Sequence, residues 1–339
     1  MQNRIDRQRR IVPELGGGSP HDTFCCKTVG DPKIAGDLLK HYSCEPAIAK
    51  YVNLKVLDPQ ETRKLTKELK KLFLDIAFIA PFQDNSKKSK FLFIFEHKSR
   101  PSRFVPIQGG TYAFLTLYRE LVSDKQPAPN KKYVPSIPIM VLIYCGDEDI
   151  DGVIRFQDIY PKGEIPDDLK RFVPQFEMLV INFRKFDYGN LPGDPETQSV
   201  VESMKRAFDG TFTKNLGHIV GRLTQQGLDT RISELITDIV RYCAWVEGLT
   251  EKQVETTITT VIKGERGRQM ARTVLKGVIK TGYESGLSRG QIIGEARGES
   301  KGETVKAQEI ARNLKKMGFK TPDIVKATGL PIKVVNKLD

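Results

Sequence analysis

Two short apolar segments, each interrupted by an acidic residue, constrain the fold of this chain more than any other feature. The first, LFLDIAFIAP, covers residues 72–81, and the second, FLFIFEHK, covers residues 91–98. Side chains alternate between the two faces of a strand, and both faces of the second segment are apolar over most of its length. Such a strand is covered on both sides. Residues 91–98 are therefore predicted to form a central strand.

The surrounding pattern predicts an α/β fold. The polar stretch between the two strands suits an antiparallel hairpin, and residues 109–121 have the periodicity of an amphipathic helix. Further strands are predicted at residues 137–144 and 178–183. The order helix, strand, strand, helix, strand is that of a mixed sheet flanked by helices. Residues 21–50 are predicted to be helical, and Asp58-Pro59 to open a strongly basic helix containing Arg63, Lys64, Lys67, Lys70 and Lys71.

The second half of the chain is predicted to be all-helical, with the neighbourhood of Trp245 as core. Glycine then recurs at every fourth position from Gly282 to Gly302, a pattern equally consistent with a flexible linker and with a helix that allows close backbone approach. Three short helices follow, with Thr321-Pro322 as N-cap and first helical residue and Gly329 at a turn, which resembles a helix-turn-helix.

These patterns divide the chain into five predicted parts. They are a flexible basic arm (1–20), an α/β domain (21–190), a helical region (191–280), the glycine repeat (281–305) and the helix-turn-helix-like tail (306–339). The tail and the repeat also suggest a homo-oligomer formed through the C-terminal helices.

The charge of the chain points to a polyanionic partner. Its formal net charge is +12, and residues 263–339 hold 17 Lys or Arg against 8 Asp or Glu. Such an excess is typical of proteins that bind DNA, RNA or an anionic membrane, although a soluble protein can also be basic without such a partner. DNA is the partner predicted here. No apolar segment is long enough to span a bilayer, and no export signal precedes the first helix. Five cysteines without CxxC spacing argue against disulfides and a zinc site, so a cytoplasmic location is expected.

The acidic residues of the two strands are the candidate site. Asp75 interrupts the first strand, and Glu96 shares one face of the second with Lys98, whereas His97 faces away and is predicted to be a packed core residue. A buried carboxylate is costly unless it is paired or binds a cation, and two carboxylates facing one point suit Mg²⁺. The spacing is also compatible with structural pairing of Asp75 and Glu96 with lysines.

Several motifs occur together in one order: His21-Asp22-Thr-Phe, Leu74-Asp75-Ile-Ala-Phe, Phe95-Glu96-His97-Lys98-Ser99, and a glycine-rich tail ending in ATGLPIKVVNKL. In this respect the chain resembles the bacterial recombination-promoting nuclease / putative transposase family of the PD-(D/E)XK nuclease superfamily. The resemblance covers residues 21 to about 120 and the extreme C-terminus.

The resemblance implies a restriction-endonuclease-like core and hydrolysis of DNA with Mg²⁺ or Mn²⁺. Asp75 and Glu96 then correspond to the metal ligands and Lys98 to the motif lysine. The resemblance adds His21, Asp22 and Gln108 as accessory residues. Phe73-Leu74 departs from the family pattern before the aspartate, and the glycine pair 109–110 departs from an uninterrupted helix start.

The sequence leaves three functions open. The first is a metal-dependent DNA endonuclease linked to recombination or mobile elements. The second is a catalytically silent protein that keeps the nuclease fold and binds or assembles on DNA. The third is a helical oligomerisation protein that works through the glycine repeat. The first two functions predict DNA binding that weakens steeply with salt, and only the first predicts cleavage.

Overall fold

A computed structural model of the whole chain separates into two compact units, residues 1–13 with 18–279 and residues 14–17 with 280–339. The structure describes residues 10–11, 19–60, 76–100, 103–122, 134–146, 150, 152–225, 227–278, 308–318 and 320–337. Asp75, the predicted basic helix at 63–71 and the glycine repeat lie outside these residues.

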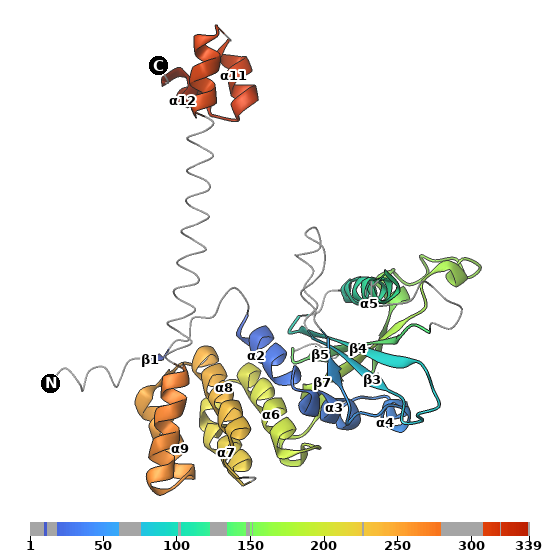
Figure 1. Cartoon of the computed structure of the whole chain (residues 1–339), viewed down its shortest axis with the longest axis vertical. Coiled ribbons are helices and arrows are strands. Elements are labelled where there is room, and N and C mark those ends of the chain that lie inside the picture. Colours follow the sequence, from blue (N-terminus) through green and yellow to red (C-terminus); the bar gives the residue numbers. More distant parts are fainter. Residues whose placement is uncertain are drawn as a thin grey trace, which may run out of the picture. The chain divides into compact units, whose positions relative to one another are not determined.

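The first unit contains a six-stranded mixed sheet (Figure 1). Its strand order is β2 (Asp58–Pro59), β3 (Ile76–Pro81), β4 (Lys90–Lys98), β5 (Ile137–Tyr144), β7 (Glu177–Asn182), β6 (Val153–Arg155). Strand β4 pairs antiparallel with β3 and parallel with β5, which pairs parallel with β7. The α/β class and the mixed sheet flanked by helices are confirmed.

Some elements differ from the prediction. Asp58-Pro59, which was predicted to open a helix, forms strand β2, whose residues pair with Ile79 and Phe78 of β3. Strand β6 was not predicted at all, because Val153–Arg155 is too short to show an alternating pattern. The four predicted strands, which are β3, β4, β5 and β7, begin and end within one residue of the predicted bounds wherever the structure describes them.

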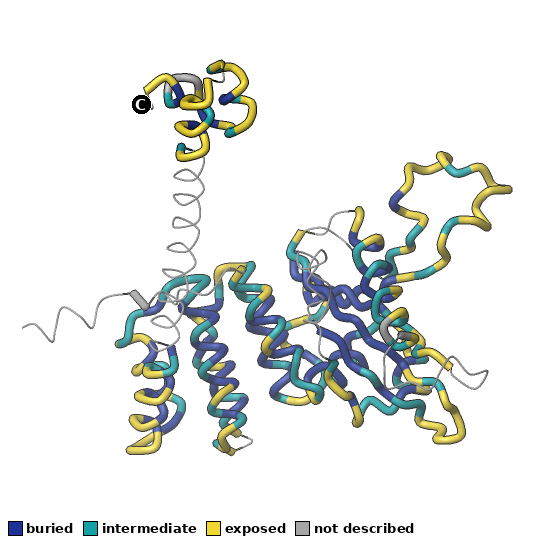
Figure 2. Tube along the Cα trace, turned by 45° about the horizontal axis from the view of Figure 1, so that its top comes forward, coloured by how far each residue is buried: buried dark blue, intermediate teal, exposed yellow. Residues whose placement is uncertain are grey.

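Strand β4 is buried on both faces, as its sequence predicts (Figure 2). Phe93 and Phe95 belong to the larger apolar core, which the helices on one side of the sheet share. Leu92 and Ile94 belong to a smaller core beneath helix α5 (Val105–Val122) on the other side. Consecutive residues of β4 therefore point into different cores, and this places Glu96 on the α5 side.

The larger core is closed by helices from both ends of the first unit. Helices α2 (Pro20–Val29), α3 (Pro32–His41) and α4 (Pro46–Tyr51) precede the sheet, and α6 (Pro195–Asp209), α7 (Phe212–Thr224), α8 (Thr230–Val246), α9 (Glu251–Val261) and a helix at 264–278 follow it. The core predicted around Trp245 is confirmed for its neighbours Cys243 and Ala244, which are buried, whereas Trp245 itself is only partly buried.

The two ends of the first unit also meet through a small two-stranded sheet. Strand β1 (Arg10–Ile11), within the predicted basic arm, pairs antiparallel with β8 (Leu249–Thr250). Leu249 is buried, whereas Thr250 caps helix α9. The arm thus contains a structured contact that its basic composition did not indicate.

Helix α5 begins four residues earlier than predicted, and its glycine pair explains why. A Cβ atom built on Gly109 would lie 2.8 Å from the sulfur of Met140, and one built on Gly110 would lie 2.7 Å from Cζ of Phe176. Both approaches are closer than a methyl group tolerates. The glycines thus allow α5 to lie directly on the sheet, and they do not interrupt the helix.

We expect Gly110→Ala to destabilise the protein by about 1–2 kcal/mol, because overpacking against Phe176 outweighs the better helix propensity of alanine. Gly221→Ala in α7 is the matched control. Its added methyl would meet Val261 at 3.7 Å, an ordinary contact, so it should stabilise by up to about 1 kcal/mol. Urea unfolding measures both, and equal effects of the two variants would refute the close-packing explanation.

Within the described residues of the second unit, three short helices share a core of their own. They are a helix at 308–316, α11 (Thr321–Thr328) and α12 (Ile332–Lys337), and their buried side chains are Ala311, Ile324, Leu330 and Val335. Gly329 ends α11 with a φ of +68°, as the predicted turn requires. The predicted start is displaced by one residue, because Lys320 is the N-cap and Thr321 lies inside the helix.

Candidate functional site

The candidate site lies at the carboxyl end of strand β4, where a glutamate is buried beside a lysine. The side chain of Glu96 is 4% exposed, and its Oε1 forms an ion pair with Nζ of Lys98, whose side chain is 31% exposed. Lys98 lies two residues further along the strand, so both side chains project from one face. The site therefore has a buried anionic end and a cationic end that reaches solvent.

Helix α5 supplies the neutral part of the site. The amide of Gln108 donates to Oε1 of Glu96 over 3.0 Å and to the hydroxyl of Tyr112 over 2.9 Å. Residues four apart lie on one face of a helix, so Gln108 and Tyr112 together face the end of β4. The structure thus brings three of the predicted residues together: Glu96, Lys98 and Gln108.

Tyr112 is the site residue that the sequence analysis missed. It is buried at 1% exposure among the apolar residues under α5, so its hydroxyl had no distinguishing pattern. The sequence feature that could have identified Tyr112 is its spacing of four residues from Gln108. A polar side chain and a tyrosine at that spacing, just after a strand that ends in Glu-x-Lys, indicate that both face the strand end.

His97 has a polar partner on the opposite face of the strand. Its side chain is 1% exposed, and its Nδ1 donates to Oδ1 of Asp22 over 2.7 Å. This hydrogen bond is the main reason that the pKa of Asp22 lies below its usual value, and the charge of Lys98 lowers it further. His97 is a buried histidine, as predicted, but the carboxylate of α2 orients it.

The predicted accessory pair His21 and Asp22 divides between two surroundings. Asp22 reaches the end of β4 through His97, whereas Nδ1 of His21 lies 2.6 Å from the hydroxyl of Tyr242 in α8. The ring of His21 also stacks on Phe208, with 4.4 Å between centroids. His21 therefore contacts the helical layer, and Asp22 contacts the strand that bears the candidate site.

Burial lowers the pKa of His21, and the neighbouring His97 lowers it further. The folded state consequently binds fewer protons at His21 than the unfolded state, whose pKa is about 6.5. The stability that neutral His21 contributes is thus complete above that value and is lost as the pH falls below it. We expect His21→Phe to show a smaller fall in the free energy of unfolding between pH 7 and pH 5 than the wild type. Identical pH slopes in urea unfolding would contradict this.

Asp75 cannot be placed in this site directly, because it lies outside the described residues. Among the residues that are described, no three His, Cys, Asp or Glu side chains form a metal-binding group. None of the described helices combines the length and the apolar character needed to cross a bilayer.

These features define an α/β protein with a carboxylate, an ammonium group and an amide gathered at the end of a central strand. A family model described as "Putative transposase, YhgA-like" matches residues 19–232. The match covers more than half of the chain, and the chain belongs to this family. Membership links it to mobile genetic elements. No curated protein and no solved structure matches the chain.

Proposed function

We propose that this protein is a divalent-metal-dependent endonuclease acting on DNA, with Asp75 and Glu96 as metal ligands and Lys98 as the residue that assists the attacking water. The observation that carries the proposal is the Glu96–Lys98 pair at the end of β4. A carboxylate that is almost fully buried is costly to keep ionised. Its position beside a partly exposed ammonium group is suited to chemistry on an anionic substrate.

The register of the hairpin supports a place for Asp75 beside Glu96. Ile76 pairs with Phe95 and Ala77 with Ile94. If this antiparallel register continues by one residue, position 75 is opposite Glu96, and opposite residues share a face of the sheet. We propose that the register continues in this way, which would bring two carboxylates to the α5 side at one level of the sheet.

The residues at this strand end fit a divalent cation of the magnesium type. Carboxylate oxygens are the ligands that such hard ions prefer, and Gln108 holds the Glu96 carboxylate in one orientation through the 3.0 Å hydrogen bond. A bound Mg²⁺ or Mn²⁺ supplies Lewis acidity toward a phosphate and lowers the pKa of bound water. Its charge also offsets the repulsion between two neighbouring carboxylates.

The protein's own side chains have separate tasks in this proposal. Lys98 extends from the buried carboxylate toward solvent, where its ammonium group can orient water and stabilise negative charge that develops on the phosphate. The formal charge of +12 favours binding of the DNA backbone before cleavage. The transposase-like family supports DNA as the substrate.

Nicking of supercoiled plasmid tests the proposal. We expect strand breaks that need Mg²⁺ or Mn²⁺, stop on chelation and disappear in Asp75→Ala. Asp84→Ala is the matched control, because Asp84 is an exposed carboxylate in the loop between β3 and β4 and should cut at the wild-type rate. DNA binding without cleavage at any divalent ion concentration would refute the enzyme and leave a DNA-binding protein that keeps the fold.

A further inference from the structure

An exposed apolar stripe begins at the turn before helix α5 and continues along the outward face of that helix. Phe104, Ile107, Phe114, Tyr118 and Leu121 are 50%, 43%, 64%, 62% and 51% exposed. Together with Thr111 they are spaced 3, 4, 3, 4 and 3 residues apart, the spacing of a helix–helix seam. The opposite side of α5, with Tyr112 and Ala113, packs on the sheet.

The chemistry of this stripe points to a protein helix as its partner. None of its six residues is charged, so the stripe cannot form ion pairs with a phosphate backbone. Surface helices normally turn polar residues toward water, and contiguous exposed apolar patches mark interaction sites. The stripe runs along an 18-residue helix, which at about 1.5 Å per residue is roughly 27 Å long. That length accommodates several layers of a helix pair.

We propose that the stripe binds the same stripe of a second copy of this chain, with the two α5 helices antiparallel about a two-fold axis. The spacing reads identically in both directions, which a two-fold pair requires. Alignment about the centre pairs Phe104 with Leu121, Ile107 with Tyr118 and Thr111 with Phe114 of the other copy. Each layer combines a larger with a smaller side chain, and every layer occurs twice.

The exposed area agrees with an interface between copies. Three of the five apolar side chains are aromatic, and an aromatic side chain buries on the order of 150–250 Å². With about half of each side chain exposed, the stripe offers roughly 500 Å² of apolar surface per copy. A specific interface buries about 800 Å² per partner. The stripe can therefore form the apolar centre of a dimer interface, whose remaining area belongs to a polar rim.

Sedimentation equilibrium of the full-length chain tests this pairing independently of any nuclease activity. We expect a dimer of the 38.3 kDa chain at micromolar concentration. Tyr118→Glu and Ile107→Lys should each raise the dissociation constant at least about a hundredfold, because the change occurs twice per dimer. The double variant Ile107→Lys/Tyr118→Glu should recover dimerisation, since antiparallel pairing places each lysine opposite a glutamate. If the helices were parallel, the double variant would place lysine opposite lysine and glutamate opposite glutamate, and it would stay monomeric.

Phe172→Glu is the control, because Phe172 is 71% exposed and lies outside the stripe. It should dimerise as the wild type does. Circular dichroism and thermal unfolding of every variant confirm that the exposed substitutions leave the fold intact. A wild-type chain that stays monomeric, a dimer that persists in Tyr118→Glu, or a double variant without recovery would overturn the proposal.

Discussion

Replacement of Glu96 by glutamine is expected to reduce metal-dependent DNA cleavage by about 10²–10³-fold or more, the range lost when one charge-stabilising group is removed from an active site. Glutamine keeps the size of the side chain and an oxygen that can accept from Gln108. It removes the negative charge that pairs with Lys98 and that we propose binds the cation. The rate of plasmid nicking at saturating Mg²⁺ measures the effect.

Glu177→Gln controls for the loss of a carboxylate that has no proposed role. Glu177 lies on β7 and pairs with Arg155, and both side chains are 52% exposed. This variant should nick plasmid at the wild-type rate. If Glu96→Gln folds normally and keeps full cleavage activity, Glu96 has no role in the reaction and the proposed site is wrong.

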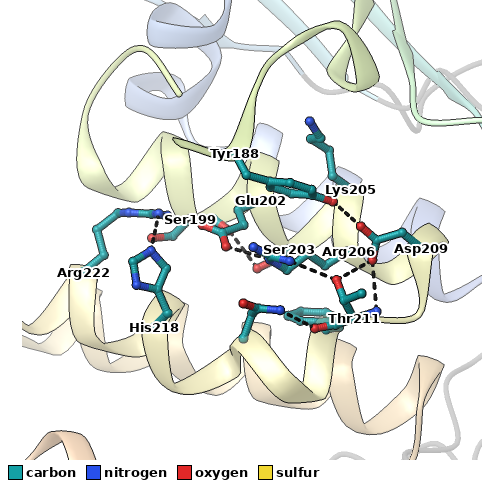
Figure 3. A network of polar contacts seen from close by, with 12 residues as sticks. Tyr188, Ser199, Glu202, Ser203, Lys205, Arg206, Asp209, Thr211, His218 and Arg222 are labelled. Carbon is teal, nitrogen blue, oxygen red and sulfur yellow. Dashed lines mark hydrogen bonds and ion pairs between the residues drawn. The ribbon is translucent and has the colours of Figure 1, made fainter. Parts of the chain in front are cut away.

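The largest expected loss of stability lies away from the candidate site, in an ion network between α6 and α7 (Figure 3). The side chain of Glu202 is 1% exposed and accepts from Nε of Arg206 over 2.7 Å and from an Nη of Arg222 over 2.6 Å. The guanidinium of Arg206 also lies 4.0 Å from the ring centroid of Tyr188. One buried carboxylate therefore neutralises two arginines.

We expect Glu202→Gln to lower the free energy of unfolding by about 3–5 kcal/mol, the cost of breaking a buried pair and leaving charge uncompensated. Urea unfolding followed by circular dichroism measures it. The exposed pair of Glu177 provides the comparison, because loss of a surface pair costs at most about 1 kcal/mol. Equal effects of Glu202→Gln and Glu177→Gln would show that the α6–α7 network contributes no more than a surface pair.

The central strands were predictable because their apolar residues show directly which strand faces are buried. Residues 91–98 alternate between two apolar faces, and the structure buries both of them. The same alternation put Glu96 and Lys98 on one face and His97 on the other. Local patterns of this kind depend only on residues that are close in the sequence, so they can be recognised before the fold is known.

Contacts between distant segments were not predictable in the same way. The hydrogen bond between His97 and Asp22 joins residues 75 positions apart, and nothing near His97 indicates its partner. The pair Gly109-Gly110 looked like a broken helix start, because its reason lies in Met140 and Phe176. Such features depend on how closely two elements approach, which only the folded structure determines.

The role of Asp75 remains a prediction, and metal binding tests it most directly. Titration of the chain with Mn²⁺, with free ion followed by electron paramagnetic resonance, should reveal a site that is lost in both Asp75→Asn and Glu96→Gln and retained in Glu177→Gln. A site that keeps its stoichiometry and affinity in both variants would contradict the claim that these two carboxylates share one cation.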